Sequence, residues 1–279
     1  MENEPHLAIE TVRGLVDATA AGFTGNMDTV IRGEGREELA RIACREEMPI
    51  VNETTYANVI SRIGKLVCVG LNYKAHANGI NMKLPEYPVI FSKFADALAP
   101  AGTEVVLPPW ESSYDYEAEL VIVMGKTAWN VCEEEALDYV FGYTCGNDFS
   151  LRDAQMRSSQ WLIGKTMPGF GPCGPCIVTA DSFALEKGKK IRSYVNGQLR
   201  QNGNTADMIF NCAQIISYAS KYIKLEPGDL IFYAKNGQVY HVVIYIGNGR
   251  TVEAASTRSG ICSHGVNYAN AVWATRLLS

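Results

Sequence analysis

Apolar runs and their spacing predict a chain with many short strands and few helices. Runs of strand length that are rich in Val, Ile, Leu or Phe occur at 7–12, 65–70, 117–124, 230–233 and 239–246. Apolar residues three or four positions apart predict helices over 33–45 and 208–222, and an acidic start predicts a short helix over 133–139. Strands and helices do not alternate regularly, so the pattern predicts an α+β fold.

Composition and charge limit the classes of function. The chain has 279 residues, of which 47% are hydrophobic and 20% charged, as in ordinary globular proteins. Its 25 Lys and Arg against 30 Asp and Glu give a net charge of −5, which argues against nucleic acid or membranes as partners. We expect a cytoplasmic protein with reduced thiols, because we see no secretory signal, no membrane-length apolar run and only eight cysteines.

The most informative acidic residues lie at the start of the predicted strand 117–124. Asp115, Glu117 and Glu119 would point to one face of a continuous strand, and Asp148 follows in a polar, turn-rich segment. Neighbouring carboxylates repel unless a cation or protons neutralise them. The pattern alone leaves two interpretations open, a solvated acidic strand end or a site for a hard cation such as Mg²⁺, Mn²⁺ or Ca²⁺.

Six segments together resemble the fumarylacetoacetate hydrolase family over residues 7–231. They are 68–76 (CVGLNYKAH), 114–120 (YDYEAEL), 146–155 (GNDFSLRDAQ), 160–165 (QWLIGK), 204–210 (NTADMIF) and 225–231 (LEPGDLI). The resemblance implies a strand-rich mixed β-sheet roll with a small N-terminal subdomain, assembled as a homodimer. It also implies Mg²⁺ or Mn²⁺ held by Glu117, Glu119 and Asp148.

The same resemblance assigns the remaining site residues. Arg152 and Gln155 would contact an anionic small-molecule substrate, a 2-oxo acid or a 1,3-dicarbonyl compound. Lys165 and His76 would be catalytic, with Lys165 adding positive charge and His76 acting as acid and base. The implied activity is metal-dependent C–C hydrolysis or lysis, or decarboxylation or tautomerisation, through a metal-stabilised enolate.

One departure from the family pattern affects this prediction. Family hydrolases carry a glutamate three residues after the histidine, and this chain has Gly79 there, so activation of water is expected to suffer. Two alternatives therefore stay open at this point. Beside the implied activity, they are a catalytically impaired member that only binds metal and ligand, and a peptidase remnant whose function lies in its tail.

Three patterns are expected to carry no chemistry. Residues 173–176 (CGPC) look like a redox pair, but a strand-like run follows where such a pair needs a helix start. Residues 169–174 match G-x-G-x-x-G without a following helix. Zinc binding by the thiols of this segment together with Cys262 and His264 is disfavoured by their long separation.

The tail reads differently from the rest of the chain. Residues 232–249 (FYAKNGQVYHVVIYIGNG) resemble the end of an NlpC/P60 cysteine peptidase, in which His241 would be the base and Glu253 its orienting group, but no nucleophile context is present. A recombined gene is the favoured explanation, with 239–246 as a plain strand that replaces the family's closing strand. The expected division is 1–60, a small N-terminal subdomain, 61–231, the catalytic domain, and 232–279, an incomplete peptidase-like tail.

Overall fold

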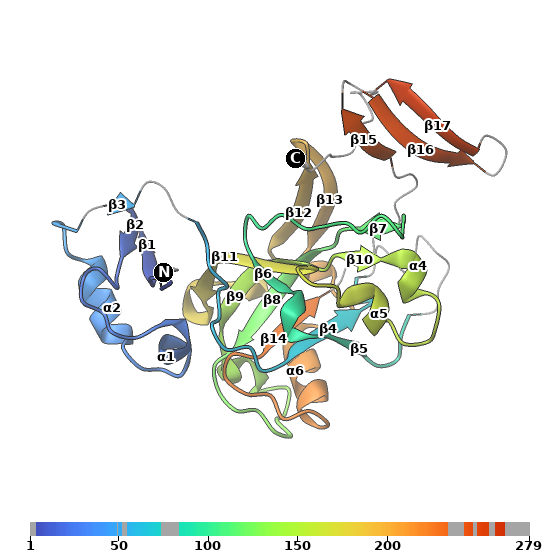
Figure 1. Ribbon diagram of the computed structural model, residues 1–279. Coiled ribbons are helices and arrows are strands. Elements are labelled where there is room, and N and C mark those ends of the chain that lie inside the picture. Colours follow the sequence, from blue (N-terminus) through green and yellow to red (C-terminus); the bar gives the residue numbers. More distant parts are fainter. Residues whose placement is uncertain are drawn as a thin grey trace.

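A computed structural model describes residues 4–48, 50–51, 55–73, 84–233, 243–247, 250–256 and 260–265. The leading residues form a small three-stranded antiparallel sheet in the order β1-β2-β3. Its elements are β1 (Ala8–Thr11), β2 (Gly14–Asp17), α1 (Met27–Ile31), α2 (Arg36–Ala43) and β3 (Ile50–Val51). The strand predicted at 7–12 and the helix predicted at 33–45 are therefore confirmed, and Figure 1 shows this unit in blue beside the main sheet.

A seven-stranded mixed sheet forms the centre of the protein (Figure 1), in the order β5-β4-β14-β8-β9-β11-β6. The strands are β4 (Leu66–Gly70), β5 (Val89–Lys93), β6 (Leu98–Pro100), β8 (Ala118–Met124), β9 (Val140–Asn147), β11 (Gly171–Thr179) and β14 (Leu230–Tyr233). The last of these lies between β4, with which it is parallel, and β8, with which it is antiparallel. The strand predicted at 230–233 is thus a central strand, and its four residues are all buried.

Both faces of the central sheet are covered. Along β8, Ile122 and Met124 pack into one apolar core with Ile215 of α6 (Cys212–Ser220), while Val121 and Val123 face a second core that includes residues of the N-terminal unit. A strand covered on both faces reads as a continuous apolar run, which is what the sequence shows here. The observed architecture is α+β with a mixed sheet, as predicted.

Helix α6 is shorter than the predicted 208–222 for a local reason. The side chain of Asn211 caps the helix by accepting a hydrogen bond from Gln214 N, and the side chain of Gln214 bonds the backbone N–H of Asn211 in return. The preceding residues are extended because Ile209 N and Phe210 N donate to the backbone and side chain of Asn72 instead. The helix predicted at 133–139 is reduced to one 3-10 turn, η2 (Ala136–Tyr139).

The remaining elements surround the main sheet. They are β7 (Tyr114–Asp115), β10 (Ser150–Leu151), α4 (Arg152–Gln155), α5 (Leu162–Lys165), β12 (Lys190–Val195), β13 (Gln198–Asn204) and the 3-10 turns η1 (Ala95–Ala97), η3 (Ala180–Ser182), η4 (Leu185–Lys187) and η5 (Thr205–Asp207). Among the described residues, no helix has the length and apolar character needed to cross a bilayer.

The tail contains a separate three-stranded antiparallel sheet. Its strands are β15 (Val243–Gly247), β16 (Arg250–Ser256) and β17 (Gly260–Gly265). A strand near 239–246 is confirmed over 243–247, but in the described part of the tail it pairs with β16 and not with the central sheet. The expectation that it replaces a closing strand of that sheet is therefore wrong for these residues, because β16 provides its hydrogen-bonding partners. His241 lies outside the described residues.

Candidate active site

Pairing between β8 and β9 brings three carboxylates together. Ala118 lies opposite Asn147 in the ladder, so the residues on either side, Glu117, Glu119 and Asp148, meet at one end of the strand pair. Asp148 N donates to Glu117 O at 2.9 Å, and Glu117 N donates to Asn147 Oδ1 at 3.0 Å. The three side chains are buried, and each offers an oxygen within 4.8 Å of the others.

The acidic segment is not one continuous strand, contrary to expectation. It is interrupted between β7 and β8, because the backbone N–H of Glu117 bonds the side chain of Asn147 and that of Tyr116 bonds the side chain of Asp115. The carboxylates nevertheless lie in the protein interior, so the interpretation as a solvated acidic strand end is wrong.

Two buried lysines bind this carboxylate cluster. Lys165 Nζ lies 2.6 Å from Glu117 Oε2 and 2.7 Å from Asp148 Oδ2. Lys93 Nζ lies 2.6 Å from the other oxygen of Asp148, so this carboxylate sits between two ammonium groups. Both lysine side chains are fully inaccessible to solvent, and burial of this kind requires ionic partners.

Arg152 connects a fourth acidic residue, Asp115, to the cluster. Its Nε and Nη2 donate to Asp115 Oδ2 at 2.9 and 2.6 Å, and Nη2 also contacts Glu117 Oε1 at 2.5 Å. Its Nη1 donates to Gln155 Oε1 at 2.8 Å. The Arg152 side chain is 25% exposed, whereas those of the two lysines are fully buried, so Arg152 is the cation of this cluster that solvent reaches.

Two glycines allow the short helices α4 and α5 to approach the cluster closely. A Cβ added to Gly164 would lie 2.6 Å from Gln155 Cα and would also collide with the backbone nitrogen of that residue. A Cβ at Gly70, the last residue of β4, would collide with the Trp161 ring. These contacts fix the turn that carries Lys165 against the helix that carries Gln155 and Arg152.

The cluster has strongly perturbed protonation. Burial alone would raise the pKa of Asp148, but the ammonium groups of Lys165 and Lys93 outweigh it and hold that pKa at about 2. Burial likewise opposes the charge on Lys165, yet Asp148 and Glu117 raise its pKa to about 12. The pKa of Glu117 is raised, first by burial and then by the charge of Asp148, because these two carboxylates share one ammonium.

The structure brings together most of the residues predicted from the sequence. Six of them, Glu117, Glu119, Asp148, Arg152, Gln155 and Lys165, lie in or beside the cluster. His76 and Gly79 lie outside the described residues. Sequence reasoning missed Lys93, although one lysine within the otherwise largely apolar segment 89–94 (VIFSKF) was a usable signal of a buried charge.

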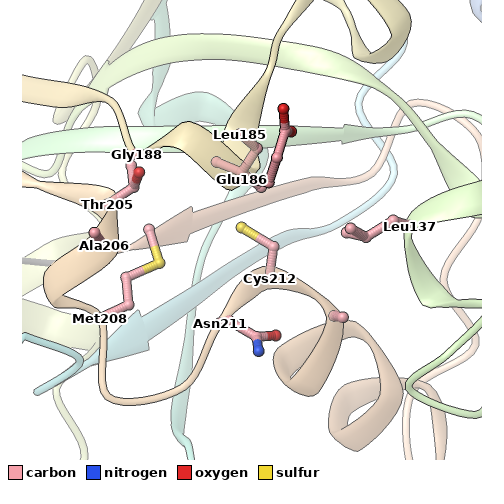
Figure 2. A pocket seen from close by; sticks show the side chains of 10 residues that line it. Leu137, Leu185, Glu186, Gly188, Thr205, Ala206, Met208, Asn211 and Cys212 are labelled. Atoms are coloured by element: carbon pink, nitrogen blue, oxygen red, sulfur yellow. The ribbon is translucent and has the colours of Figure 1, made fainter.

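A separate cavity of about 350 Å³ lies away from these carboxylates (Figure 2). Its walls come from η4, η5 and the first turn of α6, with the sulfur atoms of Met208 and Cys212 directed inward. Burial raises the pKa of the Cys212 thiol to about 11, so this thiol is a poor nucleophile at neutral pH. The cavity shares no residue with the carboxylate cluster.

Comparison with known proteins identifies relatives over most of the chain. The family described as fumarylacetoacetate (FAA) hydrolase C-terminal matches residues 65–267. A "fumarylacetoacetate hydrolase domain-containing protein 2 homolog" of Dictyostelium discoideum is 46% identical over 61% of this chain and 59% of its own length. The human protein named "oxaloacetate tautomerase FAHD2A, mitochondrial" is 38% identical over 81% of this chain and 75% of its own.

Solved structures agree with this result. A fumarylacetoacetate hydrolase from Exiguobacterium antarcticum superposes with a TM-score of 0.74 at 28% identity, covering 84% of each chain. A 5-carboxymethyl-2-hydroxymuconate delta-isomerase from Mycobacterium smegmatis gives a TM-score of 0.57 at 30% identity, covering 72% of this chain and 73% of its own.

These comparisons correct the interpretation of the tail. The prediction that the resemblance ends near residue 231 is wrong, because the family match continues to residue 267. An NlpC/P60-like segment at 232–279 finds no support. The likeness rested on alternating Val and Ile around a histidine, a pattern that any half-buried strand shows.

Proposed function

This chain belongs to the fumarylacetoacetate hydrolase family, and from that membership and the buried cluster we propose that it is a divalent-metal enzyme acting on 2-oxo acids. Glu117, Glu119 and Asp148 would hold the metal, Mg²⁺ or Mn²⁺. The observation that carries the proposal is that three carboxylates converge in the protein interior. Apolar residues would serve packing alone at least as well as buried charges, so the carboxylates point to a function.

The donor set fits such an ion. Hard divalent cations take carboxylate oxygens, and a soft metal would favour thiol or imidazole ligands. Within the described residues, the only group of three or more potential metal-binding side chains is this all-oxygen set. A bound cation would act as a Lewis acid that polarises the 2-oxo group of a substrate.

The formal charges of the cluster also support a cation. Asp115, Glu117, Glu119 and Asp148 carry four negative charges when ionised, against three positive charges on Lys93, Arg152 and Lys165. The excess negative charge disfavours an anionic substrate, whereas a divalent cation would make the site positive. Metal and 2-oxo acid should therefore bind in a mutually dependent way.

The side chains of the site have separable roles in this proposal. Arg152, which solvent reaches, meets the substrate carboxylate, and Gln155 is held beside it by the 2.8 Å contact with Arg152 Nη1. Lys165 stays an ammonium at neutral pH, because its pKa is about 12. In this arrangement it serves as a positive charge that favours an enolate oxygen nearby.

Keto–enol tautomerisation or decarboxylation of an oxaloacetate-like acid is the preferred reaction. Both need stabilisation of an enolate, and neither needs an activated water. Gly79 replaces the family's glutamate, so His76 lacks the partner expected for hydrolysis of acylpyruvates. The human relative bears the name oxaloacetate tautomerase, which supports the same choice. Hydrolysis of a 1,3-dicarbonyl compound such as an acylpyruvate is the second candidate. The name of the Exiguobacterium relative, fumarylacetoacetate hydrolase, supports C–C hydrolysis of a 1,3-dicarbonyl compound.

The test combines metal binding with a substrate assay. Mn²⁺ affinity is measured by calorimetry, and loss of the enol form of oxaloacetate and of acetylpyruvate is followed by ultraviolet absorption, with and without a chelator. Glu119→Gln keeps the shape of the side chain and removes one charge, so Mn²⁺ binding and activity should both fall about tenfold or more. Glu37→Gln, at an exposed position of α2, is the matched control and should change neither.

Two results would contradict the proposal. Mn²⁺ affinity that is the same in Glu119→Gln as in the unsubstituted chain would remove the metal assignment. Acetylpyruvate hydrolysis faster than oxaloacetate tautomerisation and decarboxylation would replace the preferred reaction by the second candidate.

A further inference from the structure

Lys93 is a second buried lysine whose contacts differ from those of Lys165. It is the last residue of β5, an edge strand of the central sheet, and its side chain is fully inaccessible. Its Nζ lies 2.6 Å from Asp148 Oδ1. It also donates to Phe149 O at 3.1 Å, to Phe170 O at 2.9 Å and to Lys165 O.

These acceptors belong to three separate parts of the site. Phe149 directly follows Asp148, Lys165 ends α5, and Phe170 precedes β11. Phe149 N donates to Phe170 O, so a backbone hydrogen bond also joins the two phenylalanines whose carbonyls bind Lys93. An ammonium has three protons for these four acceptors, so at least one proton is shared between two of them, and every acceptor is fixed backbone or a buried carboxylate. The head group of Lys93 is therefore held in place.

Lys165 differs in this respect. Its Nζ contacts two carboxylates, Glu117 and Asp148, which are the proposed metal ligands, and it lies 5.2 Å from the centre of the Phe91 ring. The contacts of Lys165 are therefore with the reacting part of the site, while those of Lys93 are mainly with the framework behind it.

We propose that Lys93 is a positioning residue, which fixes the orientation of the Asp148 carboxylate toward a divalent cation and anchors the main chain that presents Lys165. The inference rests on the proposed function, since it concerns the same metal. In this role Lys93 does not contact the substrate. It acts through the Asp148 carboxylate, which would bind the metal. Groups that orient metal ligands typically change metal affinity 10–100-fold when they are removed.

Charge and orientation predict opposite effects of the same substitution. Lys93→Met removes a positive charge 2.6 Å from Asp148, which by Coulomb's law alone should favour a cation at the cluster. Loss of orientation should weaken its binding. We expect the second effect to prevail, with Mn²⁺ affinity about tenfold to a hundredfold lower in Lys93→Met by calorimetry.

Lys93→Arg supplies an independent variant, because it leaves no buried carboxylate without a counter-charge. Its planar guanidinium cannot reproduce an ammonium among three carbonyls, so Mn²⁺ affinity should also fall about tenfold although the charge is kept. Lys65→Met is the matched control. Lys65 Nζ pairs with buried Asp229 at 3.1 Å, away from the carboxylate cluster, and its loss should leave Mn²⁺ affinity unchanged.

A second readout separates positioning from a general structural defect. If Lys93 acts through Asp148, oxaloacetate turnover in the variants should need more Mn²⁺ for half activation and should recover most of its kcat at saturating Mn²⁺. Unchanged or tighter Mn²⁺ binding in Lys93→Arg, or a low kcat that excess Mn²⁺ does not raise, would overturn the inference. Absence of Mn²⁺ binding in the unsubstituted chain would instead refute the proposed function, and the inference with it.

Discussion

The charge of Asp148 affects both folding and the site. It lies between two lysines, and removing one partner of a buried ion pair typically costs about 3–5 kcal/mol, since the remaining charge is left uncompensated. Asp148→Asn should therefore lower the free energy of unfolding at pH 7 by an amount of that order. Urea unfolding monitored by circular dichroism measures it.

The pH dependence of this effect follows from the pKa of Asp148. Its ordinary value is 3.8 and its value in the folded protein is about 2, so the stabilisation is fully present above pH 4 and is lost as pH falls through 2. The difference in unfolding free energy between the unsubstituted chain and Asp148→Asn should shrink between pH 4 and pH 2. A difference that stays constant over this range would show that the carboxylate charge is not the stabilising feature.

Residue types at the site were largely predictable, and their partners were not. Acidic residues at alternate positions before an apolar run, together with the family motifs, identify Glu117, Glu119 and Asp148. The contacts of Arg152 with Asp115 and Glu117 depend on pairing between β7 and β10, which no local pattern specifies. Lys93 is 55 residues from Asp148 in the chain, so only the tertiary fold brings them together.

At the level of elements, Gly164 should be intolerant of substitution. The added methyl group in Gly164→Ala would collide with the backbone of Gln155, and overpacking of this kind costs about 1–3 kcal/mol. Because α5 also carries Lys165, oxaloacetate turnover should fall with stability. Gly197→Ala, in the turn between β12 and β13, meets no neighbouring atom, and should lose stability through its positive φ of 74° while activity is kept.

Asn72, just after β4, is joined by two hydrogen bonds to Phe210, just before α6. Its side chain donates to Phe210 O at 2.9 Å and accepts from Phe210 N at 2.8 Å, and it is fully buried. Asn72→Ala leaves both backbone groups without these bonds and should cost about 2–4 kcal/mol. Asn72→Asp keeps the acceptor for Phe210 N but places a carboxylate oxygen against Phe210 O in the interior, so at neutral pH it should lower the thermal unfolding midpoint at least as much as Asn72→Ala.

Helix and strand positions were predicted better than their ends. The strands at 65–70, 117–124 and 230–233 were found because a strand buried on both faces has a continuous apolar run. The helix at 208–222 was overextended, since its first residues have helical spacing but bond the side chain and main chain of Asn72, 138 residues away from Phe210. Such long-range backbone contacts are invisible to local periodicity.

At the level of the whole molecule, several expectations remain predictions. They are the divisions at residues 60 and 231, the second of which the family match crosses, the homodimer, and a cytoplasmic location, which contrasts with the mitochondrial relatives. Light scattering tests the dimer, which should give a mass of twice the 30.6 kDa of one chain. A monomer at micromolar concentration that still turns over oxaloacetate would contradict it.

The position of the cluster also makes a prediction for the stability of the whole fold. Its ionic groups come from β5, β7, β8, the end of β9 and the two helices α4 and α5, so a metal held here would link the ends of β8 and β9 within a cluster that joins several elements of the fold. A ligand that binds only the folded state adds about 2.7 kcal/mol of stability at a concentration one hundred times its Kd. For a chain of this length, that corresponds to a rise of about 5–10 °C in the unfolding midpoint.

Scanning calorimetry with and without Mn²⁺ measures this rise. The unfolding midpoint of the unsubstituted chain should rise by this amount. Glu119→Gln should lose about half of the shift or more, because one of the three ligands no longer carries charge and the affinity is tenfold or more lower, whereas Glu37→Gln should keep it. An equal rise in both variants would mean that Mn²⁺ stabilises the protein at some other place. No rise in the unsubstituted chain, at concentrations that calorimetry shows to be saturating, would mean that Mn²⁺ binds the unfolded chain as well as the folded one, and so does not depend on the assembled carboxylate cluster.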